Sequence, residues 1–124
     1  MSTPFEELAN LDKLIHEPAR LALLTALSVC ESADFLSLRR LTGLSDGNLS
    51  VQLSKLEEAG LVQIRKQFVA KKPKTLASIT AKGSLAVQRH WDQLNAIRQN
   101  AAAWEHDELQ EKPAQTSRPV RRKP

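Results

Sequence analysis

Apolar residues recur at helical spacing over the N-terminal quarter of the chain. The first series is spaced by three and four residues: Phe5, Leu8, Leu11 and Ile15. It predicts an amphipathic helix that ends before Pro18. Proline suits the first turn of a new helix, and the leucines and alanines that follow it form an apolar face as far as about Cys30. The pattern therefore predicts two helices, of which the second lies at the centre of the core.

Two further helices are predicted after a polar break at residues 31–34. The first is short, covers residues 35–42 and ends at Gly43. Ser45 is a good N-cap for the second, which runs to residue 59 and has a buried leucine stripe: Leu49, Leu53 and Leu56. Two such helices with a short glycine-containing turn between them form a helix-turn-helix.

The pattern then changes to that of a β-hairpin. Residues 61–68 place apolar side chains among polar ones as a strand does, and residues 74–79 offer a second strand. Between them lies a short basic tip with the sequence Ala70-Lys71-Lys72-Pro73.

A last helix is predicted to begin after Thr80 and to carry a heptad-like apolar stripe that starts at Val87. Continued to about Glu111, it would extend about 45 Å, which exceeds the body of so small a domain. Its far half therefore needs another surface. We expect a homodimer that buries the rest of the stripe: Trp91, Leu94, Ile97, Ala101 and Trp104. Packing against the N-terminal helix of the same chain is the alternative.

One domain accounts for the regular pattern. The 124 residues suffice for one modest core, and we assign residues 1–112 to it. From Pro113 onward the chain has almost no apolar residue with which to offset the entropy of ordering. Residues 113–124 are therefore predicted to be a disordered basic tail. The expected fold class is mainly α with a small β-hairpin.

The charges are segregated along the chain. The net charge of +4 comes entirely from the tail, because residues 1–112 contain 14 Lys and Arg and 14 Asp and Glu. No acidic residue occurs from Ala59 through Trp91, whereas seven Lys and Arg do. One surface of the fold is therefore predicted to be basic, and polyanions are its natural partners.

The sequence offers no pattern for a metal, a cofactor or enzymatic chemistry. Cys30 is the single cysteine, and we expect it to be a small buried residue near a helix end. His16, His90 and His106 lack Cys or acidic neighbours at ligand spacing, and neither a phosphate-binding glycine loop nor a nucleophile elbow occurs. The chain also lacks an apolar run long enough for a membrane span and a secretion signal, so we expect it in the cytoplasm without membrane contact.

Three segments carry a family resemblance: LIHEPARLALLTAL, LRRLTGLSDGNLSVQLSKLEEAGLV and FVAKKPKTLASITAKG. Together they resemble, from about Leu11 to Leu94, the winged-helix transcription regulators of the MarR and ArsR type, and most closely the compact winged-helix DNA-binding domain subgroup. The resemblance implies a winged helix-turn-helix with extended terminal helices. It also implies a sequence-specific regulator that binds double-stranded DNA as a homodimer and is not an enzyme.

In that family the start of the third core helix enters the major groove. The resemblance therefore implies six groove-facing residues: Asn48, Ser50, Val51, Gln52, Ser54 and Lys55. Asn and Gln amides can bond bidentately to adenine, and a valine can contact a thymine methyl group. Relatives often carry His or Arg where this chain has Gln52 or Val51, so the target sequence is not inherited from them.

In the same family the hairpin tip lies over the DNA backbone or the minor groove. The implied wing contacts are three lysines, Lys71, Lys72 and Lys74, and weaker phosphate candidates are Arg39, Arg40, Arg65 and Lys66. Lysines that merely keep a hairpin soluble are the alternative. A two-fold dimer would place its recognition helices about 34 Å apart and read an inverted repeat.

Two questions stay open at the level of sequence. No set of residues identifies a small-molecule effector. A winged helix that serves as a protein-protein interaction module, without specific DNA binding, is the alternative function.

Overall fold

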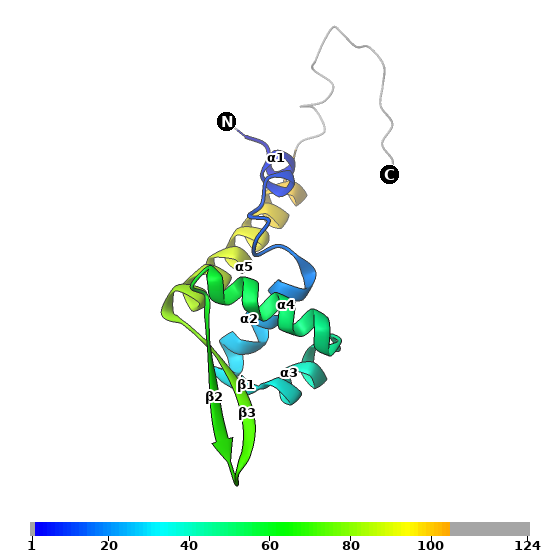
Figure 1. Ribbon diagram of the computed structural model, residues 1–124. Helices are drawn as coiled ribbons and strands as arrows, with labels where there is room; N and C mark the ends of the chain where they lie inside the picture. The colour runs from blue at the N-terminus through cyan, green and yellow to red at the C-terminus, as the bar shows by residue number, and fades with distance from the viewer. Residues whose placement is uncertain (1, 105–124) are drawn as a thin grey trace, which may run out of the picture.

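The computed structural model describes residues 2–104, and the structural statements that follow refer to this part of the chain. The elements follow the expected order along the chain and form a helical body with a projecting hairpin (Figure 1). They are α1 (Pro4–Ala9), α2 (Pro18–Cys30), β1 (Ser32–Asp34), α3 (Phe35–Thr42), α4 (Asp46–Glu58), β2 (Val62–Val69), β3 (Lys72–Ile79) and α5 (Ala81–Ala102). The predicted fold class, mainly α with a small hairpin, is confirmed.

Helix α2 lies at the centre of the core, as its apolar face predicts. Leu23, Leu24 and Leu27 are completely buried, because removing this apolar surface from water is the main driving force for folding. The other elements supply the surrounding core side chains: Leu38 from α3, Leu49, Leu53 and Leu56 from α4, and Val87 from α5.

The three strands form one antiparallel sheet in the order β1-β3-β2. The sequence predicts β2 and β3 but treats residues 31–34 as a polar break. This interpretation is wrong for β1, because Ser32 pairs with Ser78, a partner that lies far along the chain. A strand whose only partner is distant has no local hydrophobic pattern to reveal it.

The hairpin tip is tighter than expected. Ala70 and Lys71 alone connect the strands, with φ angles of 53° and 68°. Positive φ at both central residues is the mark of a type I′ turn, whose twist matches that of the flanking strands. Lys72 and Pro73 therefore belong to β3 rather than to the tip, which corrects the expected boundary.

Both terminal helices are shorter than the apolar pattern predicts. Helix α1 ends at Ala9. Leu11 and Ile15 belong to the loop that follows α1, and both are buried. Helix α5 ends at Ala102 rather than near Glu111. The predicted disordered tail, residues 113–124, lies outside the described residues.

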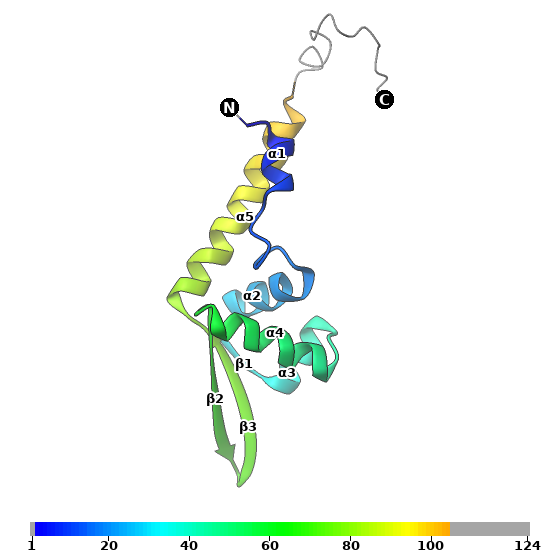
Figure 2. The same cartoon turned by 45° about the horizontal axis from the view of Figure 1, so that its top comes forward.

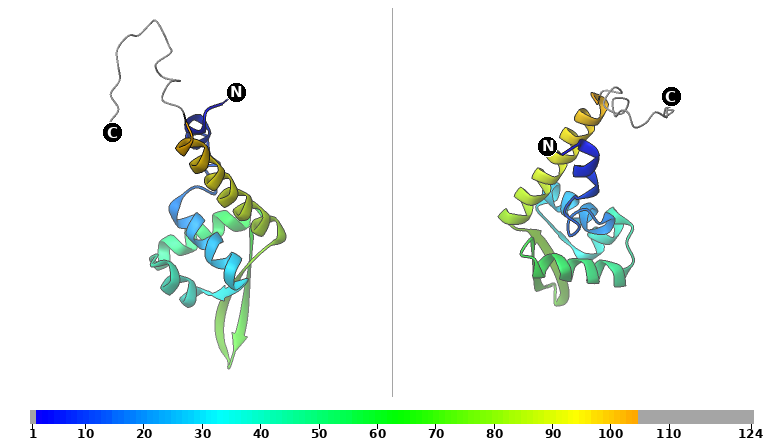
Figure 3. Two further views of the ribbon diagram at one scale, coloured as in Figure 1. Left: turned by 180° about the vertical axis from the view of Figure 1, so that it is seen from behind. Right: turned by 90° about the horizontal axis from the view of Figure 1, so that it is seen from above.

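Helix α5 leaves the body in the direction opposite to the hairpin, and α1 packs along its far half (Figures 1 and 2). The view from behind shows the same arrangement, and the view from above shows α1 beside α5 (Figure 3). The ring of Phe5 meets that of Trp104 edge-on, with 5.6 Å between the centroids. Part of the apolar stripe of α5 is thus covered by α1 of the same chain, which is the alternative to burial in a homodimer.

Two further observations complete the fold. Cys30 is exposed at the end of α2, so the expectation that it is buried is wrong. Among the described residues, no helix is both long and apolar enough to cross a membrane.

Candidate DNA-binding surface

Helix α4 lies on the outside of the helical body (Figure 1). Most of its exposed residues are polar. Ser45 begins the helix as its N-cap, because its hydroxyl accepts a hydrogen bond from the Asn48 backbone N–H at 3.2 Å. The buried leucine stripe turns the opposite face outward. Five of the six expected groove-facing residues are exposed there: Asn48, Ser50, Val51, Ser54 and Lys55.

Gln52 does not lie on this exposed face. Its side chain is 8% exposed and its amide oxygen accepts a hydrogen bond of 2.7 Å from the Arg20 guanidinium. Its amide nitrogen donates to Asn48 Oδ1 at 2.9 Å. The expectation that Gln52 faces the groove is corrected: a partner from α2, invisible in the pattern of α4, turns it inward.

Arg20 lies behind this surface, bonded to Gln52, and sequence reasoning missed it. Its Nε donates to the Leu14 carbonyl oxygen at 2.6 Å, and its Nη1 lies 3.9 Å from Glu17 Oε1. Arg20 thereby connects the loop before α2 to helix α4. The signal was present in the sequence, because Arg20 is the only charged residue of α2.

Asp34 anchors strand β3 part-way along the hairpin. Its carboxylate caps α3 by accepting the Ser37 backbone N–H at 2.7 Å, and its second oxygen lies 3.3 Å from Lys74 Nζ. The hydrogen bonds from Ser37, first the backbone and then the side chain, lower the pKa of Asp34. Burial opposes this shift and Lys74 adds to it. Lys74 is therefore already paired within the chain.

The remaining basic candidates differ in whether another residue of the chain already binds them. Lys71 and Lys72 are exposed at and beside the turn. Arg39 donates to Asp46 Oδ1 at 2.8 Å, which joins the two helices of the helix-turn-helix. Arg40 and Lys66 are exposed. Arg65 donates a long hydrogen bond of 3.4 Å to the side-chain oxygen of Gln63.

A compact junction fixes the wing and α5 to the end of α4. Thr80 caps α5 by accepting the Gly83 N–H at 2.9 Å, and its hydroxyl donates to the Gly60 carbonyl oxygen at 2.7 Å. Gly83 is packed so closely against Leu61 that a Cβ would collide with the Leu61 carbonyl oxygen. This contact explains why the helix start has the form Thr-x-x-Gly.

The stripe on α5 is only partly free for a second chain. Ile97 is 3% exposed in the single chain, so the expectation that it needs a partner for burial is wrong. Leu94, Ala101 and Trp104 are half-buried. Trp91 remains 41% exposed, and its indole N–H donates to Thr25 Oγ1 at 3.0 Å.

A histidine pair links the loop before α2 to α5. His16 Nδ1 and His90 Nε2 lie 2.9 Å apart, and His90 is buried. Burial and, second, the proximity of His16 lower the pKa of His90, and Asp12 opposes the shift. Among the described residues, no group of three or more His, Cys, Asp and Glu side chains has the geometry to hold a metal.

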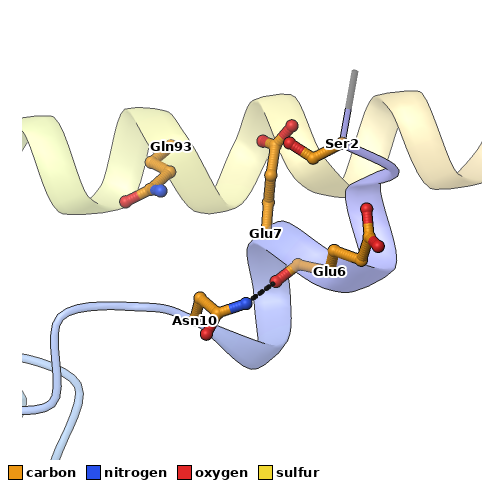
Figure 4. A pocket seen from close by; sticks show the side chains of 5 residues that line it. All are labelled: Ser2, Glu6, Glu7, Asn10 and Gln93. Atoms are coloured by element: carbon orange, nitrogen blue, oxygen red, sulfur yellow. Dashed lines mark hydrogen bonds between the residues drawn. The ribbon is translucent and has the colours of Figure 1, made fainter.

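A small hollow beside α1 has a local structural origin. It is lined by five polar side chains, Ser2, Glu6, Glu7, Asn10 and Gln93 (Figure 4). The Asn10 amide donates to the Glu6 carbonyl oxygen at 2.8 Å, and the Glu6 carboxylate accepts the Thr3 N–H as part of the helix cap. These groups complete the ends of α1, far from the wing.

Comparison with protein families matches residues 19–97 to the family described as the winged helix DNA-binding domain. The match covers α2 through most of α5, including the whole helix-turn-helix and wing. The chain belongs to this winged-helix family. An uncharacterized protein of Methanocaldococcus jannaschii is 35% identical over 78 residues, which are 63% of this chain and 85% of that protein.

Solved structures of transcription regulators share this winged-helix fold. A transcriptional regulator homologue from Pyrococcus horikoshii superposes with a TM-score of 0.72 at 26% identity, over 79% of this chain and 96% of that one. A MarR-family transcriptional regulator from Silicibacter pomeroyi superposes with a TM-score of 0.57 at 20% identity, over 90% of this chain and 67% of that one. The winged-helix chain therefore has the MarR-like fold of DNA-binding transcription regulators.

Proposed function

We propose that this winged-helix protein is a transcription regulator that binds a specific duplex DNA sequence as a homodimer. Helix α4 enters the major groove, and the β2–β3 wing contacts the backbone or the minor groove. The observation that carries the proposal is the exposed polar face of α4, held in fixed relation to a wing that carries Lys71 in its turn and Lys72 beside it.

The charges of the surface support different roles for α4 and for the wing. Helix α4 contains Asp46, Glu57 and Glu58 but Lys55 as its one basic residue, so it contributes little net attraction for phosphate. The acid-free stretch from Ala59 through Trp91 contains the wing and supplies that attraction. The wing provides affinity, and the polar side chains of α4 choose the sequence.

Dimerisation is proposed through α1 and α5. These helices extend beyond the body and leave large apolar side chains exposed, among them Leu8 at 49% and Trp91 at 41%. A monomer gains nothing from exposing them, whereas a two-fold partner would cover both copies at once. The two α4 helices would then meet an inverted repeat.

The DNA-binding proposal is tested by selection from a random duplex library at low salt. Enrichment of a site is expected. Asn48→Ala should change the base preference at one position of each half-site, and Lys71→Ala should weaken binding to every sequence about equally. A wild-type protein that selects no site, or that captures a protein partner without shifting DNA, would support the interaction-module alternative instead.

The dimer is tested by sedimentation of the full chain. Leu8→Glu should yield a monomer, because it places a charge on the proposed interface without touching the core. Val29→Glu is the matched control, since Val29 is a 79% exposed apolar residue at the far end of α2. Both variants should keep the wild-type helix content. A wild-type monomer at high concentration would contradict this part of the proposal.

A further inference from the structure

Arg20, Gln52 and Asn48 are joined by two hydrogen bonds in which the donor and acceptor roles are fixed. A guanidinium group can only donate, so the Gln52 amide must turn its oxygen toward Arg20. The Gln52 nitrogen then faces Asn48 and donates to Oδ1. The orientation of both amides follows from the chemistry of Arg20, because a flip of either amide would place donor against donor or acceptor against acceptor.

The direction of these hydrogen bonds is fixed by the Arg20 end, because the Arg20 side chain is constrained. The Arg20 side chain is 11% exposed and is also bound to the Leu14 carbonyl oxygen, so it cannot turn away without leaving buried donors unpaired. Gln52 is buried between Arg20 and the surface. Asn48 itself is exposed in the first turn of α4, where the winged-helix recognition surface begins.

We propose that Arg20 and Gln52 are positioning residues that make Asn48 present its Nδ2 donor, rather than its oxygen, to the DNA groove. This inference rests on the proposed function. Purine N7 is an acceptor in both adenine and guanine, so discrimination comes from the exocyclic groups: guanine O6 and thymine O4 are acceptors, whereas adenine N6 and cytosine N4 are donors. At the exocyclic group of the base it faces, Asn48 therefore selects guanine or thymine. The bidentate adenine contact suggested by residue type alone is replaced by this choice.

Gln52→Glu tests the inference by reversing the polarity of the last bond. The new carboxylate still accepts from Arg20 but cannot donate, so Asn48 turns its amide, donates Nδ2 inward and presents Oδ1 to the groove. The preference at the position that Asn48→Ala alters should move from guanine or thymine to adenine or cytosine. We expect the relative enrichment to change about tenfold, with the other positions unchanged.

Gln63→Glu is the matched control, because it adds the same charge at an exposed position of β2. It should leave the base preference unchanged. Asn48→Asp gives a second route should Gln52→Glu fail to fold. A carboxylate at the exposed first turn of α4 is compatible with the helix dipole, presents only acceptors, and should also select adenine or cytosine.

The outcomes separate the inference from the function on which it rests. If wild-type protein selects a site but prefers adenine or cytosine at the position that Asn48→Ala alters, the inference is overturned. It is equally overturned if Gln52→Glu folds, binds and selects the wild-type bases with only a uniform loss of affinity. If wild-type protein selects no site at all, the proposed function fails first.

Discussion

His16 Nδ1 and His90 Nε2 approach to 2.9 Å, so the loop before α2 is bonded to the middle of α5 by two titratable rings. One ring must accept where the other donates, which is possible only while at least one of them is neutral. His90, the buried partner, is the ring whose pKa is lowered. The contact joins the part of the chain that carries Arg20 to the helix proposed for dimerisation.

Stability should fall as the medium becomes acidic in the histidine range. Because the folded-state pKa of His90 lies below its ordinary value of 6.5, the unfolded chain binds more protons below that pH. The free energy of unfolding should be constant above about pH 7 and decrease below about pH 6.5, by at most about 1.4 kcal/mol per pH unit, until the folded-state pKa is passed. Urea denaturation across this range measures the decrease.

His90→Gln is the control for this pH dependence. An amide can still bond to His16 but does not titrate, so the decrease below pH 6.5 should be largely lost. The same decrease in the variant would assign the pH dependence to other groups.

Two glycines should respond to alanine in opposite directions. Gly83→Ala should lower the free energy of unfolding by about 2–3 kcal/mol, because the added methyl collides with the Leu61 carbonyl oxygen and must push α5 from its junction. Gly47→Ala, also in the first turn of a helix, meets no atom within 4 Å and should raise it by about 0.5 kcal/mol. Equal effects of the two substitutions would refute this account of the junction.

The wing turn should gain stability from glycine at the expense of DNA affinity. Lys71 has a φ of 68°, a left-handed conformation that costs a non-glycine residue about 1 kcal/mol. Lys71→Gly should therefore raise the melting temperature while it weakens DNA binding. Lys72→Gly, one residue into β3, should lower both, because glycine weakens a strand and no positive φ is relieved there.

Removing different wing lysines should change the salt dependence of DNA binding unequally. Lys71→Ala should reduce the slope of log affinity against log salt by about 0.9, as expected for one lost phosphate contact. Lys74→Ala should leave the slope nearly unchanged, because Lys74 is paired with Asp34. Equal reductions, measured by titration over a range of salt concentrations, would show that Lys74 also reaches phosphate.

Much of the fold can be predicted from local sequence, because it depends on interactions between residues that are close along the chain. The leucine spacing of α4, its Ser45 cap and the αL glycine at position 43 all act within one or two helical turns. These features place the helix-turn-helix correctly before any tertiary contact is considered. The alternation of β2 and the basic turn locate the wing for the same reason.

Several of the errors occur where a residue far along the chain decides the outcome. Strand β1 exists because residues 76–78 of β3 lie beside it, and Ile97 is buried within the chain rather than left for a partner. The apolar stripe showed correctly that α5 needs a covering surface. It carried no information on which segment, of the same chain or of another, would supply that surface.

The sequence by itself determined that Asn48 and Gln52 lie one helical turn apart near the start of α4, the helix proposed for recognition, since a spacing of four residues settles this. Only the tertiary structure decided that they are not equivalent. Arg20 approaches from α2 and draws Gln52 out of the solvent, and its inability to accept a hydrogen bond sets which atom of each amide faces the next. The orientation of the two amides depends on the contact between α2 and α4, so the sequence of neither helix alone reveals it.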